Sequence, residues 1–192
     1  KILRDNDQLI FKKEIKRHLK SNTNIIITSG AVSAGKFDFV PGIIKKFKLA
    51  NFFKSVAIRP GKPILFSKFK NTNIAFFGLP GNPISSAACF RFFVFPFLFT
   101  SLNIKKEKPF KAKLKNVFIK KKEFTRFIKG KISFSNKGLV EFEVLGGQES
   151  FRINSFTQAN SWGFFPSGKS KFKKGQFIDC FTVLPYDEML IN

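Results

Sequence analysis

The sequence predicts an α/β domain followed by a small all-β domain. Two observations lead to this fold class. Apolar strands alternate with helices as far as Leu102, and short alternating apolar runs take over beyond it. Between these two sequence patterns, the charged stretch Asn103–Pro109 contains a proline and has the composition of a linker. We therefore expect an α/β domain over residues 1–103 and a small all-β domain over 104–192.

The elements of the first domain follow from local patterns. An opening helix is predicted by the cluster Asp5-Asn6-Asp7, which can cap it, and by apolar residues near one face, namely Leu9, Ile15 and Leu19. The stretch 25–28 is β-branched throughout and predicts a buried strand. Further elements are expected to be a helix over 39–48, strands over 56–58, 64–66 and 74–77, and a helix over 83–102. This alternation predicts a parallel or mixed sheet covered on both faces, a three-layer arrangement.

The second domain is predicted from short alternating runs separated by turns such as Ser135–Gly138. The runs cover residues 112–119, 126–134, 139–144 and 176–184. Such a pattern is typical of a small barrel or sandwich.

The charge of the chain allows two interpretations. Thirty-five Lys and Arg against twelve Asp and Glu give a net charge of +23, which would attract nucleic acid or an anionic membrane. Alternatively, the excess of Lys, together with 29 Phe, reflects compositional drift in an AT-biased genome. Because the lysines are spread from end to end rather than gathered on one segment, the sequence favours drift over a nucleic-acid-binding module.

Cysteine and histidine are too scarce for a zinc site of the usual kind. Cys89 and Cys180 are far apart, and His18 is the single histidine of the chain. No disulfide framework and no signal peptide is visible in this sequence, so we expect a reducing cytoplasm.

The apolar stretch Ile84–Leu102 raises the question of a membrane span. Arg91 lies near its centre, where a charge in a spanning helix costs about 2.5–3.5 kcal/mol. Pro96 and several hydroxyl residues interrupt it as well. We expect a buried helix of a soluble domain rather than a membrane segment.

Two loops carry the chemistry that the sequence suggests. Ser29–Asp38, which reads SGAVSAGKFD, and Gly78–Pro83, which reads GLPGNP, each follow a predicted strand and precede a predicted helix. Ligands of open α/β sheets bind beyond the carboxyl ends of the strands. Glycines there let the backbone approach a phosphate, and the following helix N-terminus adds partial positive charge.

The second loop has the composition of a rigid strand-to-helix turn. Pro83 suits the first helical position, Asn82 suits the cap before it, and Gly81 permits close approach of a ligand. Pro80 and Pro83 stiffen both sides of the loop, which lowers the entropy lost on binding. By itself, this loop fits a ligand site and a purely structural turn equally well.

Charged residues near these loops are the remaining candidates. Arg59-Pro60-Gly61-Lys62-Pro63 is a tight turn that brings two cations together and could bind an oxyanion. Asp38 closes the first loop, where a magnesium ion bridging phosphates would need an oxygen ligand. Asp5 is a second candidate carboxylate, although a helix cap is the commoner role for Asp at such a position.

Taken together and in this order, the motifs resemble the molybdopterin molybdenumtransferase family, which includes the MoeA and gephyrin E-domain proteins. The motifs are SGAVSAGKFD, RPGKP, GLPGNPISS and GGQESFRINSFTQAN, the last spanning Gly146–Asn160. The resemblance implies that 1–103 is the later part of a molybdopterin-binding α/β domain and that 104–192 is the family's C-terminal β-barrel domain. It also implies that N-terminal segments of the family are absent from this chain.

The resemblance implies a reaction and a site as well. Family members insert molybdate into adenylylated molybdopterin, with Mg²⁺, and release AMP. Asp5, Asp38, Arg59 and Lys62 match catalytic positions of the family, and Asp38 and Asp5 match positions near the metal. The residues implied in binding molybdopterin are those of the two loops: Ser29, Gly30, Ser33, Gly35, Pro80, Gly81, Asn82 and Pro83.

The family pattern is not matched everywhere. The first loop commonly has two glycines where this chain has Gly30-Ala31, and Arg59 stands where many members carry Lys. The resemblance implies a homodimer in the full-length protein, in which a second subunit completes the cleft. It also implies a molybdopterin adenylyltransferase and molybdoenzymes as partners, and neither nucleic acid nor a membrane. A non-catalytic scaffold of the same family stays open as an alternative.

Overall fold

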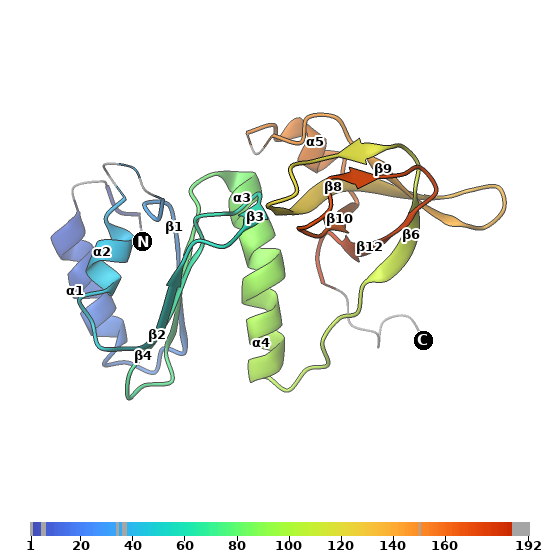
Figure 1. Cartoon of the computed structure of the whole chain (residues 1–192). Helices are drawn as coiled ribbons and strands as arrows, with labels where there is room; N and C mark the ends of the chain where they lie inside the picture. The colour runs from blue at the N-terminus through green and yellow to red at the C-terminus, as the bar shows by residue number, and fades with distance from the viewer. Residues whose placement is uncertain (1, 5–6, 34, 36–37, 150, 186–192) are drawn as a thin grey trace. The chain divides into compact units, whose positions relative to one another are not determined.

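The computed structural model describes residues 2–4, 7–33, 35, 38–149 and 151–185. The chain forms two compact units, each shown in Figure 1. Unit 1 comprises residues 1–56 and 61–86, and unit 2 comprises 57–60 and 87–192. The α/β class with a following barrel is confirmed, whereas the division of the chain at residue 103 stays a prediction.

Unit 1 is built on a mixed sheet. Its strands lie in the order β1 (Ile25–Ser29), β5 (Ala75–Leu79), β4 (Leu65–Phe69) and β2 (Leu49–Lys54). β1 and β5 are parallel and in register from Ile25 opposite Ala75 to Ser29 opposite Leu79. β4 is antiparallel to both of its neighbours. As a consequence, the carboxyl ends of β1 and β5 emerge side by side at one edge of the sheet.

Two helices pack against this sheet, α1 (Gln8–His18) and α2 (Val40–Ile44) (Figure 1). α1 buries Phe11 and Ile15, one helical turn apart, against Phe76 of β5 and its neighbours. The expected apolar face was partly wrong, because Leu9 is 84% exposed and Phe11 takes the core position instead.

Unit 2 is a closed β-barrel. Its sheet runs β10 (Ser161–Phe165), β12 (Phe177–Thr182), β6 (Phe110–Leu114), β9 (Val140–Val144), β8 (Thr125–Phe134), and β8 pairs again with β10 to close the barrel. The short strand β3 (Ile58–Arg59) joins the start of β8 in parallel. β7 (Phe118–Ile119) pairs with β11 (Lys171–Phe172), and α5 (Asn154–Thr157) precedes β10.

The barrel closes around Phe142. A Cβ added at Gly130 of β8 would lie 2.0 Å from the Phe142 ring, and one added at Gly163 of β10 would lie 2.6 Å from it. These two glycines therefore leave room for the ring in the barrel interior. The tight closure holds β8 in place, and β8 carries the cations discussed below.

The apolar stretch forms one helix over Pro83–Ser101, made of α3 (Pro83–Cys89), the π-helical turn η1 (Phe90–Val94) and α4 (Phe95–Ser101). By length and composition alone, it could cross a membrane. Arg91 at its centre is, however, almost fully buried in an ion pair with Glu107, and its Nε donates to the Thr182 carbonyl at 3.1 Å. These contacts support the expected helix of a folded domain.

Several elements differ from the sequence-based expectation. β2 and β10 were not predicted, and the expected run 112–119 is two strands, β6 and β7. The helix expected over 39–48 is confined to Val40–Ile44, because the chain after it joins the sheet as β2.

Candidate functional site

The first glycine loop starts at the carboxyl end of β1. Gly30 and Ala31 both have positive φ, +92° and +54° respectively. The Gly30 N–H donates to the Leu79 carbonyl at 2.9 Å, and the Ala31 carbonyl accepts from the Val40 N–H at 3.1 Å. Ala31 thus occupies a left-handed conformation that glycine adopts at lower cost. The loop takes up this left-handed conformation in spite of the Ala.

Asp38 closes this loop by two hydrogen bonds to one residue. Its Oδ2 accepts the Gly35 N–H at 2.7 Å, and its own N–H donates to the Gly35 carbonyl at 3.0 Å. A Cβ at Gly35 would lie 2.8 Å from Oδ2, so the glycine permits this close approach. Asp38 is partly exposed, and Ser33 and Gly35 are exposed beside it. The carboxylate is therefore held at a solvent-accessible position on the loop.

The second glycine loop lies directly against the first. Ser29 Oγ donates to the Pro80 carbonyl at 3.2 Å, and a Cβ added at Gly81 would be 3.4 Å from the Gly30 Cα. Parallel pairing of β1 with β5 is what brings the two loops together. The structure thus gathers Ser29, Gly30 and Gly81 into one place within unit 1.

Asn82 caps the helix that follows, as predicted. Its Oδ1 accepts the Ser85 N–H at 3.2 Å and its carbonyl accepts the Ser86 N–H at 2.8 Å. Pro83 is the first helical residue, where its missing N–H costs no hydrogen bond. Pro80 is buried and Gly81 is exposed, so the loop is anchored on one side and open at its glycine.

The turn Arg59–Pro63 joins the two units. Within unit 1, the Val56 N–H donates to the Lys62 carbonyl at 2.9 Å, and Gly61 has φ +104°. Lys62 is exposed and belongs to unit 1, whereas Arg59 lies on β3 of unit 2. The Arg59 guanidinium stacks over the Phe124 ring, with Cζ 4.5 Å from its centroid.

An arginine that sequence reasoning missed stands next to Arg59. The parallel register of β3 and β8 places Arg59 opposite Arg126. Burial, and then the charge of Arg59, lower the pKa of Arg126. The buried Arg126 Nε has no hydrogen-bond partner among the described residues. Nothing in the local sequence TRFIKG marks this arginine, because its neighbour comes from a distant part of the chain.

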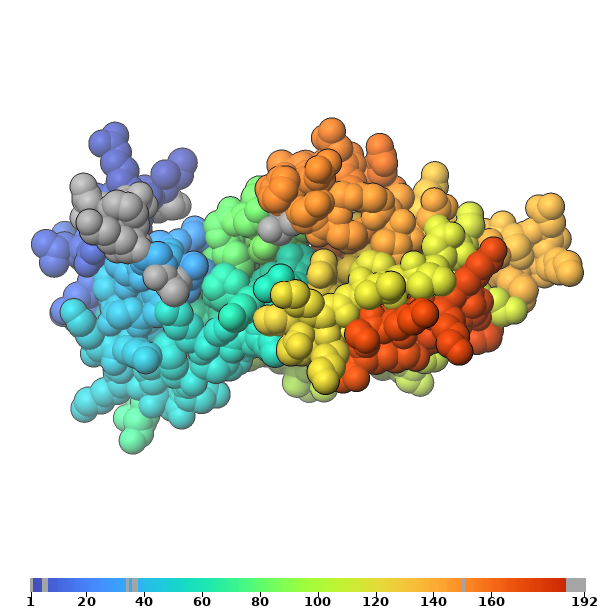
Figure 2. All heavy atoms as spheres, turned by 45° about the horizontal axis from the view of Figure 1, so that its top comes forward, coloured from blue at the N-terminus to red at the C-terminus, as the bar shows by residue number. Residues whose placement is uncertain are grey.

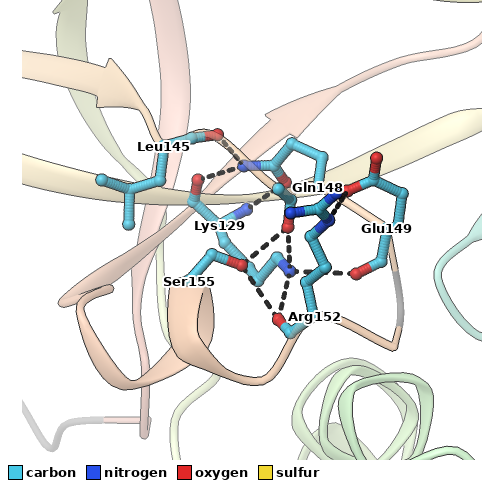
Figure 3. Close-up of polar contacts among 7 residues, drawn as sticks. Lys129, Leu145, Gln148, Glu149, Arg152 and Ser155 are labelled. Carbon is cyan, nitrogen blue, oxygen red and sulfur yellow. Dashed lines mark hydrogen bonds and ion pairs between the residues drawn. The ribbon is translucent and has the colours of Figure 1, made fainter.

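The motif GGQESFRINSFTQAN surrounds a second feature that sequence reasoning missed, the buried Lys129 (Figure 3). Only 1% of Lys129 is exposed, and its Nζ donates to the carbonyls of Gly147 at 2.7 Å and of Glu149 and Arg152 at 3.2 Å. The Lys129 backbone N–H donates to Gln148 Oε1 at 3.0 Å, and Gln148 Nε2 donates to the Lys129 carbonyl at 2.7 Å. The Lys129 ammonium therefore holds three carbonyls of the loop between Gly147 and Arg152.

The same loop borders a surface depression of about 670 Å³. The segment carrying it, in orange, lies at the surface in Figure 2. Ser155 Oγ fastens the far side of the loop by bonds to the carbonyls of Gly147 at 2.7 Å and Arg152 at 3.0 Å. Phe151 and Ile153 are nevertheless exposed.

The part of the chain that the structure describes offers few ligands for a metal ion. Those residues contain no group of three or more His, Cys, Asp or Glu that could hold one. Asp38 is the one described carboxylate that closes the first loop, and Asp5 lies outside the described residues. Mg²⁺ is often held by one or two carboxylates together with substrate phosphates and water, so Asp38 fits that ion only in company with a phosphate ligand.

Two family models match this chain. Residues 1–100 match the family described as "Probable molybdopterin binding domain", and residues 111–184 match the MoeA C-terminal region, domain IV. Together they span the two glycine loops, the RPGKP turn and the GGQES motif.

Two curated relatives carry the same name. The molybdopterin molybdenumtransferase of Haemophilus influenzae is 30% identical over 174 residues, which cover 89% of this chain and 42% of the relative. That of Staphylococcus aureus strain Mu50 is 32% identical over 183 residues, covering 91% and 40% respectively. The chain thus spans about two fifths of the length of these relatives.

Solved structures share the fold. A molybdopterin biosynthesis MoeA protein from Pyrococcus horikoshii matches with a TM-score of 0.69 and 22% identity, covering 94% of this chain and 42% of that one. A molybdenum cofactor biosynthesis protein from Pyrococcus furiosus matches with a TM-score of 0.67 and 18% identity, covering 93% and 55%. The order of the motifs, the two family models and these relatives agree, and the chain belongs to the molybdopterin molybdenumtransferase (MoeA) family, matching its molybdopterin-binding domain and its C-terminal region.

Proposed function

We propose that this chain serves molybdenum cofactor biosynthesis by inserting molybdate into adenylylated molybdopterin, with release of AMP. The observation that carries the proposal is the meeting of the two glycine loops at the ends of β1 and β5. There the Ser29 hydroxyl bonds the Pro80 carbonyl at 3.2 Å, and Gly81 faces Gly30. An exposed, glycine-lined edge at the carboxyl ends of parallel strands suits a phosphorylated pterin.

Two groups of residues in unit 1 would bind and position the substrate, one from each glycine loop. Ser29, Gly30, Ser33 and Gly35 would lie along the phosphates and the pterin on one side. The other side is the rigid turn Pro80, Gly81, Asn82 and Pro83. Asn82 fixes the helix start behind the turn, so that the partial positive charge of the helix N-terminus is directed to the loop edge. Binding in this way neutralises charge and holds the phosphoanhydride in place.

Charged side chains would bind the anions of the reaction, the incoming molybdate and the AMP that leaves. Arg59 and Lys62 supply positive charge for oxyanions, and Asp38, held by the Gly35 N–H, offers a carboxylate at the phosphate loop. Asp38, with Asp5, would hold Mg²⁺ together with substrate phosphates; when bound, that ion neutralises phosphate charge. Such electrostatic positioning is the main contribution a protein makes to phosphoryl chemistry.

The wider context follows from the family. We propose a homodimer for the full-length protein, a cytoplasmic location, and a molybdopterin adenylyltransferase and molybdoenzymes as partners. The retention of Asp38, Arg59 and Lys62 at exposed or partly exposed positions favours an enzyme over a non-catalytic scaffold.

The test is an assay of AMP release from adenylylated molybdopterin with molybdate and Mg²⁺. The chain is assayed alone and with the family's N-terminal segments supplied as a second polypeptide. Under the proposed homodimer, in which a second subunit completes the cleft, we expect no insertion by the chain alone and turnover in the mixture. Robust turnover by the chain alone would contradict the proposed shared active site.

Asp38→Asn in the mixture should lower AMP release at least tenfold, about 1.4 kcal/mol of barrier. Asp179→Asn is the matched control, because Asp179 is an ion-paired carboxylate on β12 of the barrel. Equal rates of AMP release for wild type and Asp38→Asn at ordinary magnesium concentrations would show that Asp38 is not part of the site.

A further inference from the structure

The two-stranded ribbon of β7 and β11 brings together two lysine-rich segments that are far apart in the sequence. In this ribbon Lys171 lies opposite Ile119. The segments around the two strands, residues 117–123 and 168–174, contain one carboxylate, that of Glu123, and seven lysines, at positions 120, 121, 122, 169, 171, 173 and 174. In the sequence these lysines are dispersed, and only the pairing of the two strands gathers them.

The ribbon has one face toward the barrel and one toward solvent, because side chains of extended chains alternate between two faces. Phe118 and Phe172 pack with the barrel core, and Lys120 between them is only 6% exposed. The residues that alternate with these three are all exposed, and we call them the outer ribbon face: Val117, Ile119, Lys121, Lys171 and Lys173.

The outer ribbon face is both apolar and cationic. Ile119 is 69% and Val117 is 54% exposed. The other three members are lysines, and none of them forms an ion pair with a carboxylate in the part of the chain that the structure describes. Side chains directly opposite one another on paired strands are close neighbours, so Lys171 flanks Ile119. Two aliphatic side chains are thus bordered by ammonium groups that carry uncompensated charge.

Two neighbouring lysines stabilise the ribbon from within. Lys120 Nζ donates to the Phe124 carbonyl at 2.8 Å, and its backbone N–H donates to the Ser170 carbonyl at 2.8 Å. Lys169 Nζ donates to Gln176 Oε1 at 3.2 Å, at the turn that follows β11. These contacts hold the ribbon on the barrel, and the lysines of the outer ribbon face are left for an anion from outside.

We propose that the outer ribbon face binds the surface of a lipid bilayer that contains anionic lipids. Val117 and Ile119 would enter the boundary between headgroups and acyl chains, as the apolar side of an interfacial segment does. Lysine stems lie along apolar surface while their ammonium groups stay at the headgroups, and each lysine near an anionic leaflet is attracted to it. The chain would associate reversibly with the membrane surface through unit 2.

The chemistry of the outer ribbon face favours lipid over nucleic acid, which the same charge would attract. Proteins that bind single strands stack the bases on exposed aromatic rings, and arginine is the preferred residue for recognising nucleic-acid phosphates. The outer ribbon face consists of aliphatic residues and lysines. The aromatic rings of the ribbon, Phe118 and Phe172, face the barrel instead.

The experiment is co-sedimentation of the whole chain with vesicles. Vesicles of about three parts phosphatidylcholine to one part phosphatidylserine are compared with phosphatidylcholine alone, at about 0.15 M salt. We expect binding to the vesicles that contain phosphatidylserine. The combined variant Lys121→Gln, Lys171→Gln and Lys173→Gln should bind them at least tenfold more weakly.

A matched control separates this face from the net charge of the chain. The combined variant Lys13→Gln, Lys16→Gln and Lys20→Gln removes the same charge from exposed positions in and next to α1, and should bind the vesicles within about twofold of wild type. Ile119→Ser keeps the charge and should weaken vesicle binding about threefold. All these positions are exposed, so the thermal midpoint followed by Trp162 fluorescence should stay at the wild-type value.

Equal losses in the two lysine variants would show that binding follows net charge and would overturn the inference. Failure of the wild type to sediment with the phosphatidylserine vesicles would overturn it as well. A random single-stranded RNA serves as competitor. Preferential binding of this RNA, weakened by the lysine variant of the ribbon and unaffected by Ile119→Ser, would make the face a nucleic-acid surface and contradict the proposed lipid partner. None of these outcomes depends on the proposed molybdate insertion.

Discussion

Replacing Lys129 by Met should destabilise the barrel unit strongly, because one ammonium group holds three backbone carbonyls. Those of Gly147, Glu149 and Arg152 would lose their donor, and the buried methionine cannot replace it. Hydrogen bonds from a charged donor contribute about 1.5–3 kcal/mol each. Burial of the ammonium lowers the pKa of Lys129 and offsets part of this, and the partly exposed loop can take up water. We therefore take less than three times the lower limit for one bond and expect a net loss of about 3 kcal/mol.

The barrel contains its own reporter for this experiment. Trp162, the single tryptophan, is 1% exposed and pairs with Lys129 across β10 and β8. Thermal unfolding followed by its fluorescence should show a midpoint lowered by roughly 6–12 °C. Lys131→Met, at an exposed position of the same strand, should change it by less than about 2 °C. A midpoint for Lys129→Met as close to wild type as that of the control would refute the anchoring role of this lysine.

Two further predictions concern the loop glycine and the buried thiols. Gly81→Val should weaken molybdopterin binding at least tenfold with little change in the thermal midpoint, because its Cβ would stand 3.4 Å from the Gly30 Cα at the loop edge; a collapse of the midpoint together with affinity would make Gly81 a structural glycine. Burial raises the pKa of the Cys89 and Cys180 thiols from the ordinary 9.0 to about 12, so a disulfide reagent at pH 8 should modify neither until the chain unfolds. The unfolded thiols ionise first, so the free energy of unfolding should fall as pH rises from about 9 towards 12, and stability that is unchanged over this window would contradict the burial of the thiols.

Local signals in the sequence predicted the first unit well. A β-branched run predicted β1, and the order Asn82, Pro83 predicted a capped helix start, because both patterns act within a few residues. The position of the two glycine loops beyond strand ends was predicted by the same reasoning. Their contact could be inferred only through the parallel pairing of β1 with β5.

The features that sequence reasoning missed depend on contacts between distant segments. β10 has a glycine in its middle, which weakens a strand signal, yet Gly163 is required because the Phe142 ring occupies the space of its Cβ. Arg126 is one of 35 cations, and only its pairing with β3 sets it apart. Lys129 likewise reads as an ordinary strand cation until the loop carbonyls around its ammonium are seen.

The most direct test of the central claim is a titration of the isotope-labelled chain with adenylylated molybdopterin, followed by backbone amide resonances. This measurement detects weak binding and reports where the ligand lies. The account predicts that the largest shifts occur at Gly30, Ala31, Gly35, Gly81 and Asn82, at the carboxyl ends of β1 and β5. Shifts centred instead on the Gly147–Gln158 loop of the barrel, or none at saturating ligand, would contradict it.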